Sequence, residues 1–198
     1  MAEAKITAKG QNPMHLVNKV NNLAPDFIPD GLVEPNVRGV KAGMQVSEIV
    51  KEPLGKMFQA AEKEGLVLFL ASAYRSYGYQ EDLFHKKVCT VGAEAANQYV
   101  AKPGQSEHQT GLAVDITCES EQYDLNETFA TTKEGKWLSK NAHHFGFILR
   151  YPADKVLLTG YNNEPWHFRY IGDNEIAAFI YEKQLCLEEY IENTRPSN

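Results

Sequence analysis

The chain has 198 residues, of which 43% are hydrophobic and 23% charged, as is ordinary for one globular domain large enough to bury a core. A net charge of −6 gives little electrostatic support to a nucleic-acid partner. Three scattered cysteines are too few for a disulfide framework, and no apolar run approaches the roughly 20 residues of a membrane span. These numbers argue against a nucleic-acid-binding protein, a disulfide-stapled domain and a membrane-spanning chain.

The N-terminal part predicts a flexible segment over residues 1–12, followed by an extended segment that wraps the domain. Prolines at positions 13, 25, 29 and 35 make helix improbable between residues 13 and 40. We expect apolar side chains to pin this segment to the core, namely Leu16, Val17, Leu23, Phe27, Ile28, Leu32 and Val33. A helix should begin after an N-cap at Ser47 and run to about Glu64, where Gly65 stops it.

The middle of the chain alternates between apolar runs and helical patterns. Residues 66–73 form a continuous apolar run that is short enough for a buried strand, and an aromatic and polar loop follows over 74–80. Helices are expected over residues 81–90 and 93–101, with a break near Gly92. A strand is expected over residues 112–118, and then a polar loop over 119–132.

The C-terminal third predicts a helix over residues 132–145 that ends at Gly146, and strands over 147–151, 156–159 and 164–171. Asp173 should cap a final helix that runs to about Leu185. Turns, and not helices, separate the last three strands, which favours an antiparallel or mixed sheet with helices packed on it. We therefore predict a single α+β domain over residues 13–198.

His108 and Asp115 lie in the stretch 106–115, and both are good zinc ligands when deprotonated. Positions seven apart point to opposite faces if both lie in one strand. His108 should therefore lie in a loop, where Gly111 allows the bend that brings it back over Asp115.

A third ligand candidate, His167, follows Glu164 by three positions, and Pro165 keeps Glu164 out of a helix. Core packing is the alternative for this segment. Three protein ligands with an open fourth position are typical of catalytic zinc, whereas structural zinc has four. For the other histidines we expect structural roles; they are His15, His85, His143 and His144.

The motifs Ser106-x-His108-x-x-Gly111-x-Ala113-x-Asp115 and Glu164-x-x-His167 resemble those of the VanY and LdcB type of zinc D-Ala carboxypeptidases. That family shares a fold with the VanX dipeptidases and the Hedgehog signalling domain, so the resemblance implies this fold. It extends from about Leu16 to Tyr190. Further matching segments are residues 72–76, 99–104, 146–152 and 185–190.

The resemblance implies one zinc ion per chain, held by His108, Asp115 and His167. It implies that Glu164 is the general base and that Arg75 faces the substrate. The alternative for Arg75 is a surface salt bridge. Residues implied to contact the peptide are Ser106 and Gln80, with Tyr74 and Trp166 as further candidates for the substrate-binding wall. Arg150 could bind a substrate carboxylate or form a structural ion pair.

The implied function is hydrolysis of the C-terminal D-Ala from peptidoglycan stem peptides or muropeptides by a monomeric enzyme. D,D-carboxypeptidase, L,D-carboxypeptidase and D-Ala-D-Ala dipeptidase activities share this chemistry, and the motifs leave them open. A cell-wall-binding module without turnover and a purely structural metal site also stay open. The first residues lack a hydrophobic signal core, which permits a cytoplasmic protein or an extracytoplasmic one whose leader or anchor has been removed.

Overall fold

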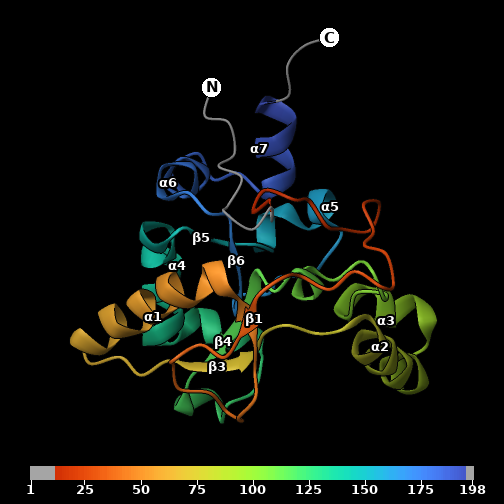
Figure 1. Ribbon diagram of the computed structural model, residues 1–198, viewed down its shortest axis with the longest axis horizontal. Helices are drawn as coiled ribbons and strands as arrows, with labels where there is room; N and C mark the ends of the chain where they lie inside the picture. Colours follow the sequence, from red (N-terminus) through yellow and green to blue (C-terminus); the bar gives the residue numbers. More distant parts are fainter. Residues whose placement is uncertain (1–11, 195–198) are drawn as a thin grey trace.

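A four-stranded antiparallel sheet lies at the centre of the computed structural model, which describes residues 12–194 (Figure 1). Its strands are β3 (Phe69–Ser72), β4 (Ala113–Thr117), β5 (Phe147–Leu149) and β6 (His167–Tyr170), in the order β3-β4-β6-β5. Strands β4 and β6 are the inner pair, so each has a neighbouring strand on both sides. The predicted α+β class with an antiparallel sheet is confirmed.

Helices α1 (Glu48–Lys63) and α4 (Lys133–Asn141) cover one side of the sheet (Figure 1). Apolar residues recur along α1 at helical spacing and are buried at Val50, Leu54, Met57, Phe58 and Ala61. They join one core with Leu70, Val114, Phe168 and Leu138. The predicted bounds of α1, including Ser47 as N-cap and a left-handed Gly65 after its end, are confirmed.

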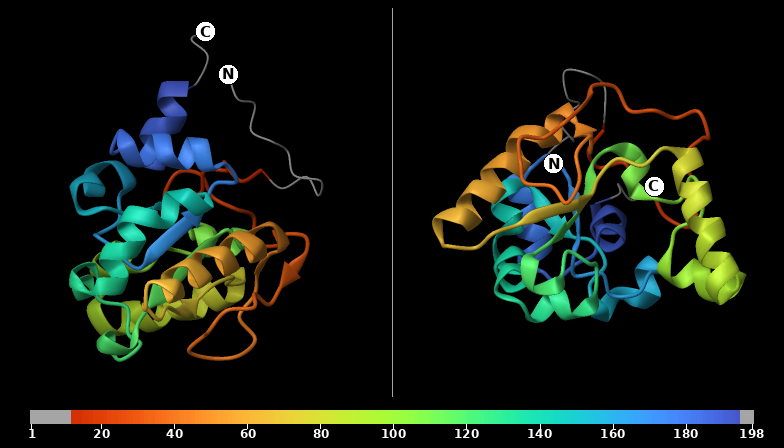
Figure 2. Two further views of the ribbon diagram at one scale, coloured as in Figure 1. Left: turned by 90° about the vertical axis from the view of Figure 1, so that its left-hand side faces the viewer. Right: turned by 90° about the horizontal axis from the view of Figure 1, so that it is seen from below.

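Two further layers complete the domain. Helices α6 (Asn174–Glu182) and α7 (Leu187–Thr194) lie above the sheet in Figure 1, and Ile180 and Leu187 share a smaller core with Ile148 of β5. Helices α2 (Tyr77–Val91) and α3 (Ala93–Tyr99) form a pair on the opposite side of the molecule from α1 and α4. The right-hand view in Figure 2 shows the same separation of α1 from α2 and α3.

The segment between residues 13 and 40 is extended and wraps the domain, as predicted. Its residues Leu32–Val33 form β1, which pairs with β2 (Val46–Ser47). Val17 and Leu23 are buried and pin the segment to the core. Ile28 does not, because 67% of its surface is exposed, so that part of the expectation is wrong. The expected flexible segment lies outside the described residues, except for Asn12.

Several boundaries differ from the sequence-based expectation. Residues Val156–Thr159 form a short helix, α5, and not a strand. Leu157 is fully exposed and Leu158 half-exposed, so this apolar run fills no place in the sheet. Helix α2 begins at Tyr77, inside the expected loop, because the Ser76 hydroxyl accepts a hydrogen bond from the Tyr79 amide and caps the helix.

The C-terminal region holds a helix, α7, that the sequence pattern did not predict. Gln184 has a positive φ of 52° and follows the end of α6, and the Glu189 carboxylate accepts a hydrogen bond from the Cys186 amide at 2.8 Å to start α7. Strand β6 is also shorter than expected, because Glu164 lies in the turn before it, where its carbonyl accepts from the His167 amide.

The connections between these elements contain short 3-10 helices, η1 (Glu107–Thr110), η2 (Glu119–Glu121), η3 (Glu127–Thr131), η4 (Ala142–Phe145) and η5 (Ala153–Lys155). Within residues 12–194, no helix combines the length and apolar character that crossing a membrane requires.

Candidate active site

His108 lies in η1, directly before the turn into β4. Gly111 takes a left-handed conformation with φ of 69°, and a Cβ atom there would meet the Ser47 amide nitrogen at 2.9 Å. Only glycine suits this bend, which turns the chain from η1 into the strand that carries Asp115. The Nδ1 atom of His108 lies 2.7 Å from the Ala73 carbonyl oxygen, so Nδ1 carries the proton and Nε2 is left to face Asp115 at 3.2 Å.

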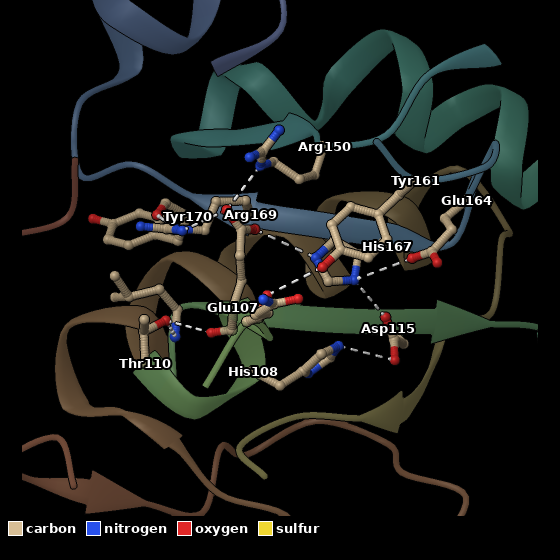
Figure 3. Close-up of polar contacts among 12 residues, drawn as sticks. Glu107, His108, Thr110, Asp115, Arg150, Tyr161, Glu164, His167, Arg169 and Tyr170 are labelled. Atoms are coloured by element: carbon tan, nitrogen blue, oxygen red, sulfur yellow. Dashed lines mark hydrogen bonds and ion pairs between the residues drawn. The ribbon is translucent and has the colours of Figure 1, made fainter. Parts of the chain in front are cut away.

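Asp115 and His167 are directly opposite each other in the paired strands β4 and β6. Cross-strand partners have side chains on the same face of a sheet, which explains why two residues 52 positions apart meet here. The Nδ1 atom of His167 lies 3.0 Å from Asp115 Oδ1 (Figure 3). The antiparallel register therefore brings the third predicted ligand to the other two.

The His108, Asp115 and His167 side chains offer two ring nitrogens and one carboxylate oxygen, all within 4.8 Å of one another and all buried. Among residues 12–194 this is the group of His, Cys, Asp and Glu side chains that could hold a metal ion. Zinc prefers this donor set, and three protein ligands leave a coordination position for water or substrate. The residues therefore fit a catalytic zinc ion.

The electrostatics of the two histidines also suit a cation. Burial, with the nearby Arg75 guanidinium, lowers the pKa of His108 to about 4, so its imidazole is neutral and free to bind a metal. Burial disfavours a charged His167, but the Asp115 and Glu107 carboxylates beside its two ring nitrogens outweigh this and raise the pKa of His167 to about 9. A positive charge is thus favoured beside Asp115.

Glu164 lies at the edge of the three predicted ligands. Its Oε2 atom is 3.7 Å from His167 Nδ1, and its amide donates to the Tyr151 carbonyl at 3.0 Å. Burial is the largest influence on this carboxyl group and raises the pKa of Glu164 to about 7. About 15% of its side-chain surface stays exposed, so solvent and substrate can reach it.

Arg75 also reaches the site. One guanidinium nitrogen donates to Asp115 Oδ2 at 2.6 Å, and Nε donates to the Ser72 hydroxyl at 2.9 Å. Arg75 therefore forms a mostly buried ion pair with a predicted metal ligand, with 17% of its side chain exposed, in place of the surface salt bridge that was the alternative.

A cavity of about 360 Å³ opens onto this group, and its walls test the candidate substrate contacts. Ser106 and Trp166 line it, together with Arg75 and Glu164. Gln80 and Tyr74 are not among the lining residues. The Gln80 side chain instead donates to the Ala101 carbonyl at 2.8 Å, which ties α2 to the loop before Ser106.

Two buried aromatic residues of this cavity, both tyrosines, were not predicted from the sequence. Tyr151 and Tyr161 line it and are almost fully buried, and the Tyr151 ring centroid lies 4.8 Å from that of His167. Neither tyrosine carries a spacing signal, since both lie in the turns between β5 and β6. Arg150, a candidate substrate contact, is fully buried and forms a structural ion pair with Glu188. The substrate role considered for it is therefore wrong.

The other four histidines lie outside this group. His15 and His85 are exposed, on the wrapping segment and on α2. His143 and His144 contact each other in η4, and the His143 ring stacks on Tyr181 with centroids 4.1 Å apart.

Curated proteins include clear relatives of this chain. The YodJ protein of Bacillus subtilis (strain 168), a putative carboxypeptidase by name, is 44% identical over 189 residues, which cover 93% of this chain and 69% of YodJ. A D-alanyl-D-alanine carboxypeptidase of Enterococcus faecalis (strain ATCC 700802 / V583) is 37% identical, over 89% of this chain and 64% of the relative. The chain thus spans about two thirds of the length of these relatives.

Solved structures agree with this likeness. The LdcB LD-carboxypeptidase has a TM-score of 0.86 and 42% identity, over 93% of this chain and 89% of that chain. A VanY D,D-pentapeptidase mutant in complex with Zn(II) has a TM-score of 0.74 and 34% identity, over 91% and 99% of the two chains. A VanYB complex with D-alanine-D-alanine has a TM-score of 0.76 and 33% identity, over 93% and 100%.

The family model described as VanY, D-alanyl-D-alanine carboxypeptidase, matches residues 43–173, which include His108, Asp115, Glu164 and His167. The match covers more than half of the chain. The chain belongs to the VanY family of D-alanyl-D-alanine carboxypeptidases.

Proposed function

We propose that this protein is a zinc carboxypeptidase that removes the C-terminal D-Ala from peptidoglycan stem peptides. The observation that carries the proposal is the buried group of His108, Asp115 and His167, with the Glu164 carboxylate beside it at the edge of a 360 Å³ cavity. A cavity of this size lies in the range that holds small ligands. One zinc ion per chain matches the three ligands.

Zinc bound by His108, Asp115 and His167 would lower the pKa of a water molecule toward about 7 and polarise the scissile carbonyl. Glu164 is the general base: its carboxylate takes a proton from the attacking water and passes it to the departing amine. Its position 3.7 Å from His167 Nδ1 supports this role, because the carboxylate lies next to the atoms that would hold the metal.

Arg75 is a permanently charged donor on the cavity wall, and it stabilises the substrate carbonyl as negative charge develops on its oxygen. Its bonds to Asp115 and Ser72 hold the guanidinium in place before substrate arrives. Ser106 and Trp166 contact the peptide from the same cavity. Gln80 acts indirectly, by holding the loop at Ala101. Tyr74 does not line the cavity and stays a candidate from the sequence alone.

The substrate class is supported by the relatives. The LdcB structure concerns peptidoglycan recognition, and the VanYB structure contains D-alanine-D-alanine. Such a substrate would place the enzyme outside the cytoplasmic membrane, and this location is part of the proposal. All the site residues come from one chain, so we also propose that a monomer is active.

The experiment that tests the proposal compares three substrates: a stem tetrapeptide, a stem pentapeptide and free D-Ala-D-Ala. The purified zinc-loaded protein is incubated with each, and released D-Ala is measured by mass spectrometry, with a chelator-treated sample as control. We expect D-Ala from at least one stem peptide and none after chelation. Release from D-Ala-D-Ala alone would identify a dipeptidase, and binding of the stem peptides without release would identify a non-catalytic binding module.

A further inference from the structure

Glu107 precedes the predicted ligand His108 in η1, and its side chain is fully buried. Its Oε1 atom accepts hydrogen bonds from Arg150 Nε at 2.7 Å and from Arg169 Nη1 at 2.8 Å (Figure 3). Both arginines are buried as well. Two guanidinium groups that donate to one oxygen at these distances are the partners of an ionised carboxylate, so Glu107 is a carboxylate anion.

The second oxygen of this carboxylate has a different neighbour. Glu107 Oε2 is buried and makes no hydrogen bond that meets ordinary distance and angle limits within residues 12–194, and the same is true of His167 Nε2. These two atoms lie 3.5 Å apart. A buried polar atom without a partner is costly, and a proton on His167 Nε2 that points to Glu107 Oε2 would give both groups a partner at once.

The opposite edge of the same imidazole faces the predicted metal. Nδ1 of His167 lies 3.0 Å from Asp115 Oδ1 and 3.7 Å from Glu164 Oε2. A neutral imidazole has a proton on one nitrogen and a lone pair on the other. When Nε2 carries the proton, the lone pair of Nδ1 points toward Asp115 and the metal.

We propose that Glu107 is a positioning residue, which fixes His167 in the Nε2–H tautomer and aims its Nδ1 lone pair at the zinc ion. This inference rests on the zinc site of the proposed function. The two histidine ligands are then oriented by different groups. The outer nitrogen of His108 bonds a neutral backbone carbonyl, that of Ala73, whereas the outer nitrogen of His167 faces a carboxylate. A carboxylate partner makes the imidazole a more basic ligand.

The surrounding contacts hold Glu107 rigidly enough for this role. Arg169 also donates to the carbonyls of Pro13 and His15, and Arg150 forms a two-pronged ion pair with Glu188 of α7, at 2.8 and 2.6 Å. Two carboxylates thus balance two guanidiniums. The extended N-terminal segment and the C-terminal helix both anchor the arginines that place Glu107.

The chain offers a matched control for the test, because Glu188 belongs to the same network but contacts Arg150 and Asn18 instead of His167. Glu107→Gln and Glu188→Gln each remove one negative charge from the buried arginines. Glutamate at position 107 offers one oxygen to the two arginines and the other to His167. Glutamine has a single side-chain oxygen, so it cannot accept hydrogen bonds from both sides. Zinc dissociation constants are measured for both variants by competition with a chromophoric chelator.

We expect Glu107→Gln to raise the zinc dissociation constant about 10- to 100-fold, and Glu188→Gln to change it less than about threefold. Wild-type zinc affinity in Glu107→Gln, or an equal loss in Glu188→Gln, would overturn the proposal. If Glu107→Gln does not fold, the wild-type zinc protein labelled with ¹⁵N-histidine gives the answer by NMR. A proton on His167 Nε2 supports the proposal, and a proton on Nδ1 overturns it. Neither readout depends on peptide hydrolysis, so this inference and the proposed function can fail separately.

Discussion

Gly111→Ala should destabilise the protein and weaken zinc binding, because this glycine makes the bend that places His108. A left-handed conformation costs a residue with a Cβ atom about 1–2 kcal/mol. The new Cβ would also lie 2.9 Å from the Ser47 amide nitrogen, which donates to the Gly111 carbonyl at 2.9 Å. Separating these backbones weakens that hydrogen bond, whose net contribution is about 1 kcal/mol. The expected total is therefore about 2–3 kcal/mol.

Gly65→Ala is the matched control, since Gly65 has a similar φ of 76° but an added Cβ would meet nothing within 4 Å. Gly65→Ala should lose only the conformational part of the unfolding free energy, about 1–2 kcal/mol. Free energies of unfolding come from urea titrations of the metal-free proteins, and zinc affinity from chelator competition. The loss of unfolding free energy should be about 1 kcal/mol larger in Gly111→Ala than in Gly65→Ala. Only Gly111→Ala should bind zinc more weakly than the wild type. Equal unfolding free energies together with unchanged zinc affinity would refute the reasoning.

Three other predictions concern catalysis, acid stability and the metal. Arg75→Lys removes the two hydrogen bonds that the guanidinium donates to Asp115 and Ser72. In the zinc-loaded protein, kcat/KM for D-Ala release should therefore fall about 10²- to 10³-fold. A wild-type rate would contradict the proposed role of Arg75. The pKa of Glu107 is depressed on folding, so the stability it contributes is present above the ordinary carboxyl pKa of 4.5 and is lost as the pH falls below it. The thermal midpoint of the wild type should therefore decrease between about pH 5 and pH 3. That of Glu107→Gln should decrease less steeply with pH, and equal slopes in the two proteins would contradict this. Free zinc at about a hundredfold excess over its dissociation constant should stabilise the protein by about 2.7 kcal/mol. Calorimetry with and without a chelator measures this difference. An unchanged thermal midpoint would exclude a zinc site that forms on folding.

The candidate ligands could be found from the sequence, because imidazole and carboxylate are characteristic metal donors and the two motifs have the spacing of a known family. The structure brings His108, Asp115 and His167 together as predicted, and it places Glu164 and Arg75 beside them. Their roles in catalysis stay predictions. Glu107 could not be recognised, because a glutamate in a polar loop looks like a solvated residue. Its burial depends on two arginines that lie 43 and 62 positions further along the chain.

The fold was predictable where one pattern dominated. The periodic apolar residues of α1 and the apolar run of β4 indicated the correct element type. Local pattern failed where neighbouring elements decide the outcome. The apolar residues Leu157 and Leu158 of α5 are exposed, so hydrophobicity suggested a strand that the sheet does not contain. Helix α7 depends on Glu189 capping the Cys186 amide and on Glu188 pairing with Arg150, a contact across 38 positions.

Glu164→Ala tests the central claim most directly, with zinc content and D-Ala release measured on the same sample. The three predicted ligands are untouched by this change, so the variant should keep one zinc ion per chain. Loss of the proposed general base should lower the rate of D-Ala release about 10²- to 10⁴-fold. His108→Ala is the companion variant and should lose both zinc and activity. A zinc-loaded Glu164→Ala protein that releases D-Ala at the wild-type rate would contradict the account.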